Sequence, residues 1–177
     1  EICACLVGSE MCIRDSIIPF KMDRKTAIEN LKNYRSLTDS AVEVNLKYII
    51  HLVGDMHCPS HVKYPGCKSG RADLNGKKMS YHAMWDWGVL DGAHGWSYSE
   101  YRLLLDTFSK REKAGMAKGT PREWLYETAV ACRVIYDWQR ADGTYGKQFV
   151  TDTYLLPERQ LILASYRLAA VLNDLFG

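Results

Sequence analysis

Two histidines in the segment 49–91 each stand four residues before an aspartate, and this spacing constrains the fold more than any other feature of the chain. His51 precedes Asp55, and His82 precedes Asp86. Because residues four apart on a helix project from one face, each pair would place an imidazole beside a carboxylate. If both segments are helical, each pair supplies half of a metal site.

These pairs favour a zinc site over ordinary surface contacts. Zinc favours nitrogen and oxygen donors in tetrahedral geometry, and a catalytic zinc uses about three protein ligands and keeps one position for water. A single His–Asp pair more often forms a surface contact. Here His57 and His61 also lie nearby, and the first pair begins inside the apolar run LKYIIHLV, where a lone imidazole is costly to bury. Together these features predict bound metal.

The segments HLVGDMHCPSH and YHAMWDWGVLD resemble the zinc-dependent nuclease family typified by the fungal nucleases S1 and P1. That family's pattern is a His, an Asp four residues later and a His six beyond it, followed downstream by a His, a variable pair, Trp and Asp. The resemblance implies a mostly helical fold with three zinc ions. It also implies hydrolysis of single-stranded DNA and RNA to 5′-phosphorylated products, and removal of 3′-phosphates from nucleotides.

The resemblance assigns a role to each matching residue. It implies that His61, His82 and Asp86 bind one zinc, which gives one nearly complete site. It implies that His51 and Asp55 bind a second zinc and that Asp55 bridges to a third. Asp55 is therefore the expected catalytic residue, because a bridging carboxylate fixes the spacing of two ions.

The start of the chain departs from the family pattern. The family's other ligands are an earlier aspartate and histidine, a mature N-terminal Trp and a nearby His, but no histidine precedes His51 and residue 1 is Glu1. Residues 1–16, EICACLVGSEMCIRDS, resemble translated sequencing-adapter DNA. We expect them to be a non-native leader and expect residues 17–177 to be the C-terminal part of a nuclease domain. A secreted or periplasmic location is implied by the family alone, whose N-terminal Trp ligand requires removal of a leader.

Two other functions stay open at this point. A zinc-dependent phospholipase C shares the fold and a similar three-zinc cluster, although the sequence context of the ligands favours the nuclease. The chain could also be an inactive helical domain with one structural zinc. The segment ADLNGKK differs from the Asp-x-Gly-Gly-Asn segment of many family members, so base preference, and the choice between polymer and mononucleotide, is open too.

Charge and cysteine content add little. A net charge of +2 over 177 residues does not by itself indicate nucleic-acid binding. Basic residues in the loop between the ligand pairs could steer a phosphate backbone or simply be solvated; they are Lys63, Lys68, Arg71, Lys77 and Lys78. Cys58 and Cys67 could pair in an oxidising compartment or remain free thiols. No run of about 20 apolar residues is present, so no membrane span is expected.

The pattern of apolar residues and helix signals predicts an all-α fold: a mainly helical single domain of the zinc-dependent nuclease and phospholipase C type. A long loop with at most one short strand, residues 56–80, should separate the two metal-binding helices. Three expected helices cover residues 23–35, 40–55 and 81–89. Two more should begin at capping boxes, one at Ser97 with Glu100 and one at Thr120 with Pro121 and Glu123. A last helix should begin at Pro157 and end near Leu175.

The remaining histidines and the aromatic residues are expected to be structural. We expect His57 to have a structural or supporting role, His94 to be an exposed loop residue, and Trp85 to pack behind the site and orient its neighbours. Other aromatic side chains at helical spacing are expected to pack in the core and not to stack on bases; they are Trp124, Tyr126, Tyr136 and Trp138.

Overall fold

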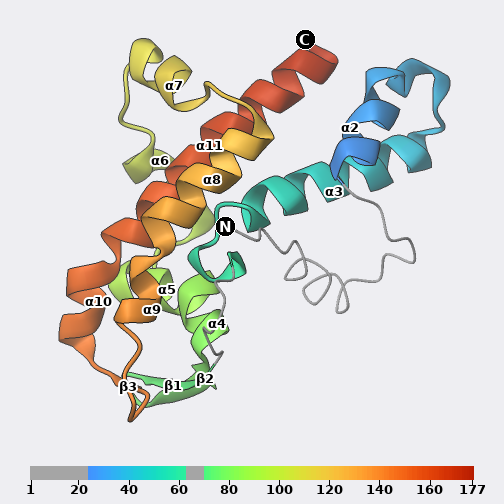
Figure 1. Ribbon diagram of the computed structural model, residues 1–177. Helices are drawn as coiled ribbons and strands as arrows, with labels where there is room; N and C mark the ends of the chain where they lie inside the picture. Colours follow the sequence, from blue (N-terminus) through green and yellow to red (C-terminus); the bar gives the residue numbers. More distant parts are fainter. Residues whose placement is uncertain (1–23, 63–69) are drawn as a thin grey trace.

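The computed structural model describes residues 24–62 and 70–177, with side chains described from residue 28 onward. These residues form many helices and one small sheet (Figure 1), which confirms the mainly helical fold. In chain order the elements are α2 (Arg24–Lys32), η3 (Tyr34–Ser36), α3 (Asp39–Asp55), η4 (Pro59–His61), β1 (Arg71–Leu74), β2 (Lys77–Ser80), α4 (Tyr81–Ala83), η5 (Met84–Gly88), α5 (Val89–His94), α6 (Tyr98–Leu105), α7 (Lys110–Met116), α8 (Pro121–Cys132), α9 (Val134–Asp137), β3 (Thr144–Tyr145), α10 (Lys147–Thr153) and α11 (Leu155–Phe176).

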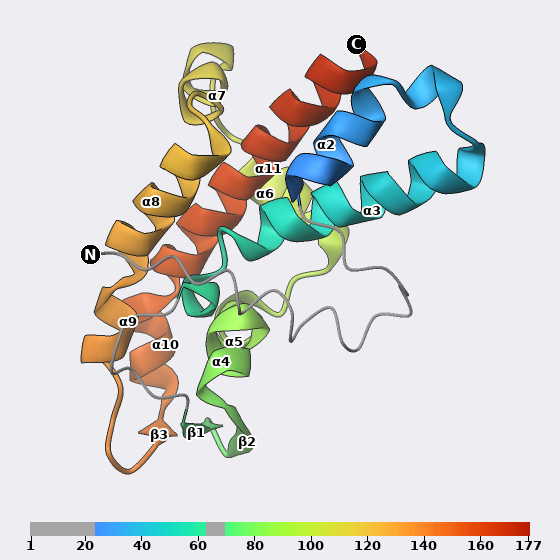
Figure 2. The same cartoon turned by 45° about the vertical axis from the view of Figure 1, so that its right-hand side comes forward.

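Helices α2, α3 and α11 enclose one of two hydrophobic clusters. Thr38 caps α3 by accepting a hydrogen bond from the Ala41 N–H at 3.3 Å. The buried face of α3, centred on Tyr48 and Ile49, packs with apolar residues of α2 and of the last turns of α11. Figures 1 and 2 show α2 against α3 and α8 alongside α11. This packing fixes the direction of α3, which ends at Asp55.

The second cluster lies between the helical segment 81–94, the sheet and α10. Trp85 is 1% exposed and stacks on Trp138 with ring centroids 5.8 Å apart. Trp124, which lies outside this cluster, is also buried. Packing is therefore confirmed for Trp85, Trp124 and Trp138. Tyr126 does not follow the prediction: its side chain is 59% exposed, because a residue two positions after the buried Trp124 projects from the opposite side of α8.

Capping boxes set the starts of three helices. The expected boxes of Ser97 with Glu100 and Thr120 with Glu123 are both formed. A third box, Ser109 with Glu112, begins α7 and divides what the sequence predicted as one helix after Ser97. The cause is local, because the Ser109 hydroxyl and the Glu112 carboxylate satisfy backbone N–H groups that otherwise lack partners at a helix start.

The loop between the ligand pairs contains more strand than expected. β1 and β2 form an antiparallel hairpin in which Leu74 pairs with Lys77, and β3 joins β1 in parallel through Leu74 and Tyr145. Asn75 and Gly76 both have positive φ, 53° and 86°, which is the type I′ geometry that Asn-Gly favours. The hairpin could therefore have been predicted from the sequence, whereas the pairing of β3 with β1 could not.

Among the described helices, none has both the length and the apolar character needed to cross a membrane.

Candidate metal centre

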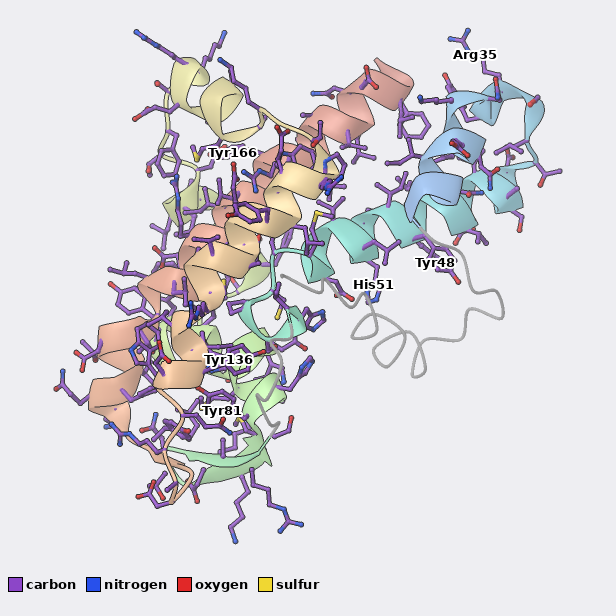
Figure 3. The ribbon with its side chains drawn as sticks, viewed as in Figure 1. Arg35, Tyr48, His51, Tyr81, Tyr136 and Tyr166 are labelled. Carbon is purple, nitrogen blue, oxygen red and sulfur yellow. The ribbon has the colours of Figure 1, made fainter. Side chains whose placement is uncertain are left out.

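The first His–Asp pair lies at the C-terminal end of α3. His51 projects from α3 one turn before its end (Figure 3), and its Nε2 atom lies 3.3 Å from Asp55 Oδ2. Both atoms are buried, and neither has a hydrogen-bond partner within the described part of the chain. Buried polar atoms without partners are costly, so an ion between this imidazole and this carboxylate would fit the site.

His61 is held between two carboxylates from different helices. It ends the short 3₁₀ turn η4, which begins at Pro59, shortly after the end of α3. Its side chain is 5% exposed, with Nδ1 3.4 Å from Asp55 Oδ2 and Nε2 3.6 Å from Asp86 Oδ1. The Tyr136 hydroxyl donates a hydrogen bond of 2.6 Å to the Val62 carbonyl and so anchors the chain directly after His61.

The second pair lies on a longer helical segment than expected. Ser80 caps it, and it continues through α4, η5 and α5 to His94, beyond the predicted end at Val89. Asp86 lies in η5, a turn of π-helix, and such turns occur frequently at functional sites. The His82 ring stacks on the His61 ring, with centroids 4.7 Å apart and planes 21° apart.

The five predicted ligands thus lie close together in the structure, each in contact with at least one other. The Cys58 side chain also lies among them. The Cys58 thiol donates to Asp86 Oδ1 at 3.3 Å. In the described part of the chain, Cys58, His61 and Asp86 are the group of three whose ligand atoms all lie within 4.8 Å of one another. His82 is placed by stacking on His61 and is not a member of this group. The sequence signal for Cys58 was its position three residues before His61.

The electrostatics of the site favour a positive charge. Burial by itself lowers the pKa of His61, but interactions with the nearby Asp55 and Cys58 side chains outweigh burial and raise the pKa to about 11. The Asp55 carboxylate and the Cys58 side chain therefore favour the protonated form of this imidazole. A metal ion would replace that proton, because an imidazole must be unprotonated to bind metal. The donor set fits zinc, which accepts nitrogen, oxygen and sulfur ligands.

His57 lies between the ligands in sequence but faces away from them, in agreement with a structural role. Its Nδ1 atom lies 2.7 Å from the Val53 carbonyl, and its Nε2 atom lies 2.9 Å from an Arg167 guanidinium nitrogen. Because a carbonyl only accepts, Nδ1 carries the proton and Nε2 accepts from Arg167. Burial is the main reason that the pKa of His57 falls to about 4, so His57 is neutral in the fold.

His94 is not the exposed loop residue that the sequence suggested. It is the last residue of α5, its side chain is largely buried, and Nε2 lies 2.7 Å from Glu158 Oε2 on α11. Its ring stacks on Trp96 with centroids 3.8 Å apart. The tertiary partner on α11 explains the difference. Cys58 is a free cysteine. Cys67, Lys63 and Lys68 lie outside the described residues, so the roles of the two lysines stay predictions.

The fold and the centre together define a mainly helical protein with a His–Asp–Cys cluster between two helical segments. The chain belongs to the S1/P1 nuclease family, whose family model matches residues 12–177. It is 27% identical to Endonuclease 2 of Arabidopsis thaliana over 83% of this chain and 58% of that protein. It is 24% identical to Endonuclease 5 of the same plant over 95% of this chain and 62% of that protein.

A fungal relative matches over a shorter region. The chain is 26% identical to Nuclease S1 of Aspergillus oryzae over 56% of this chain and 36% of that protein. The chain therefore spans less than two thirds of the length of each of these relatives.

Proposed function

We propose that the protein is a zinc-dependent endonuclease and 3′-nucleotidase that hydrolyses single-stranded DNA and RNA to 5′-phosphorylated products. The main support is the position of His61, whose two ring nitrogens lie 3.4 and 3.6 Å from Asp55 and Asp86. Two helical segments thereby contribute to one continuous cluster of ligands. The names of the relatives, which describe endonucleases and a nuclease, support the reaction class. Export from the cytoplasm is part of the same proposal.

The ligand roles follow the sequence expectation. His61, His82 and Asp86 would hold one zinc, His51 and Asp55 would hold a second, and Asp55 would be shared with a third. Donor atoms at about 2.0–2.3 Å from one tetrahedral zinc lie roughly 3.3–3.7 Å apart. The distances of 3.3 Å for His51–Asp55 and 3.6 Å for His61–Asp86 fall in this range. The side chains are thus spaced for ions without a large rearrangement.

The chain's own groups have separate tasks in the reaction. Zinc, when bound, lowers the pKa of a water molecule and offsets charge on the phosphate oxygens. Asp55, at the end of α3, would set the spacing of the ions and is the catalytic residue of the proposal. His61 would bind the ion as a neutral imidazole, while Trp85 and the aromatic side chains behind it keep the segment that carries Asp86 in place.

A surface beside Asp86 has side chains suited to binding single-stranded nucleic acid. Trp87 is 40% exposed, and the Lys77 ammonium lies 4.4 Å from the centre of its ring. Arg71 and Lys78 are exposed on the same hairpin. An exposed indole can stack an unpaired base, and the neighbouring cations attract phosphates. We therefore assign base stacking to Trp87 and backbone attraction to the hairpin.

The test combines metal content with substrate choice. After dialysis against zinc at neutral pH, elemental analysis should find about one or more zinc per chain, and the loaded protein should cleave single-stranded DNA faster than duplex DNA. Lecithin serves as the comparison substrate. Zinc binding with hydrolysis of lecithin and not of DNA would favour a phospholipase, and zinc binding without hydrolysis of either would favour a structural zinc domain. Absence of zinc would overturn the proposal.

A further inference from the structure

The Cys58 side chain faces the candidate centre from the turn that carries His61. Its Sγ atom lies 3.3 Å from Asp86 Oδ1, across a separation of 28 residues in the sequence, and 3.3 Å from the Ser60 hydroxyl. Together with His61 and Asp86 it forms the group whose ligand atoms lie within 4.8 Å of one another. The nuclease resemblance assigned no ligand role to this position.

We propose that Cys58 is a thiolate ligand of the metal that His61 and Asp86 bind, so that this centre has mixed sulfur, nitrogen and oxygen donors. The inference rests on the metal centre of the proposed function. On binding, the sulfur–metal bond forms and the thiol proton leaves to solvent. A nearby cation favours this step, because thiol pKa values fall beside metal ions.

The backbone places Cys58 and His61 on the same side of one turn. Cys58 caps η4 in an extended conformation, with φ −71° and ψ 127°, and its carbonyl accepts the His61 N–H at 3.1 Å. The thiol and the imidazole reach the same space, because their ligand atoms and that of Asp86 all lie within 4.8 Å of one another. The Cys58 N–H in turn donates to the Asp55 carbonyl at 3.1 Å, which ties this turn to the end of α3.

The distances agree with a shared ion. Sulfur lies about 2.3 Å from zinc and oxygen about 2.0–2.2 Å, so a sulfur and an oxygen on one tetrahedral zinc are roughly 3.5 Å apart. The Sγ–Oδ1 distance of 3.3 Å is close to that value. A second ligand pair, His61 Nε2 and Asp86 Oδ1, is separated by 3.6 Å. Asp86 Oδ1 thus lies at distances typical of two ligands of one ion from both Cys58 Sγ and His61 Nε2.

A fourth protein ligand changes the expected role of this metal. Cys58, His61, His82 and Asp86 together would fill a tetrahedral zinc, and four protein ligands characterise a structural site, whereas a catalytic zinc keeps one position for water. The water-activating position then lies on the side of His51 and Asp55. A thiolate also favours zinc over magnesium or calcium, which prefer oxygen donors.

Cobalt(II) substitution tests the inference without relying on activity. The purified protein is loaded with cobalt under reducing conditions, and absorption is recorded in the visible region, which reports any tetrahedral cobalt, and in the near ultraviolet, where cobalt–thiolate charge transfer absorbs strongly. We expect both signals in the parent protein. Cys58→Ser should lose the ultraviolet band and keep the visible bands, while Cys132→Ser and Cys67→Ser should keep both.

Each contrary result points to a specific error. Visible cobalt bands without a thiolate band in the parent protein would overturn the role of Cys58 and leave the proposed metal centre standing. A thiolate band that survives in Cys58→Ser and disappears in another cysteine variant would also overturn it. No cobalt binding in the parent protein would overturn the metal centre itself. Far-ultraviolet circular dichroism of each variant establishes that it is folded.

Discussion

The guanidinium of Arg167 lies 2.9 Å from Nε2 of His57, although 110 residues separate them in the sequence. Arg167 also donates to the Met116 carbonyl at 3.1 Å, contacts the Glu127 carboxylate and lies over the Trp124 ring. Helix α11 thereby holds the segment that follows Asp55. This network couples the stability of the C-terminal helix to the position of the candidate ligands.

Replacement of Arg167 by Met should destabilise the fold by about 2–4 kcal/mol, because the partly buried Met116 carbonyl and the buried Nε2 of His57 lose the Arg167 donor. The measurement is the free energy of unfolding in urea, followed by circular dichroism. Arg159→Met, on an exposed position of the same helix, is the control and should change stability by less than about 0.5 kcal/mol. Equal losses in the two variants would show that the network is not stabilising.

His57 should make the fold sensitive to acid. Its pKa is about 4 in the fold against 6.5 for the ordinary group, so the unfolded chain binds the extra proton first. The stability that depends on neutral His57 is fully present above pH 6.5. It is lost as the pH falls from there to about 4, and the free energy of unfolding drops by up to roughly 3 kcal/mol. His57→Gln should flatten the urea midpoint against pH in this window. Parallel profiles for parent and variant would contradict the assignment.

A side chain at Gly88 should destabilise the fold, because η5 packs closely on the hairpin there. A Cβ atom at this position would lie 2.9 Å from Met79 Sδ and 3.3 Å from Leu74 Cδ2. We expect Gly88→Ala to cost about 1–3 kcal/mol in thermal or urea unfolding. Gly115→Ala in α7 has open space around the new Cβ and should instead stabilise the helix by up to about 1 kcal/mol. A neutral Gly88 variant would mean that the hairpin moves easily.

Trp87 should affect substrate binding and leave metal binding unchanged. Loss of one stacked base costs about 1–3 kcal/mol, so Trp87→Leu should raise KM for single-stranded DNA about tenfold or more while zinc content stays at the parent value. Tyr98→Leu removes another exposed aromatic ring and should leave KM unchanged. An unaltered KM in the Trp87 variant would remove the stacking role.

Asp55→Asn should lower hydrolysis of single-stranded DNA by orders of magnitude and reduce zinc per chain, because the amide cannot replace a negatively charged bridging ligand. Asp174→Asn, at an exposed position near the end of α11, is the charge-matched control. Parental turnover and zinc content in the Asp55 variant would show that Asp55 does not bridge metals.

Local features of the fold could be predicted from the sequence, because each depends on residues within a few positions. Side chains four apart share a helix face, so the pairing of His51 with Asp55 was predictable and is observed at 3.3 Å. The capping boxes beginning at Ser97 and Thr120 depend on one hydroxyl and one carboxylate three residues apart. The Asn75–Gly76 turn carried an equally local signal, which our sequence prediction did not use.

Contacts between distant segments were decided by the tertiary structure. Only packing of α3, η4 and η5 places His61 between Asp55 and Asp86 and brings the Cys58 thiol to Asp86. The parallel pairing of β3 with β1 and the burial of His94 against Glu158 are of the same kind. Burial of apolar surface brings these distant segments together. Its free energy depends on the apolar area removed from water and not on a repeating spacing of residues in the sequence. The sequence by itself therefore determined which groups each element presents, and the tertiary structure decided which of them meet.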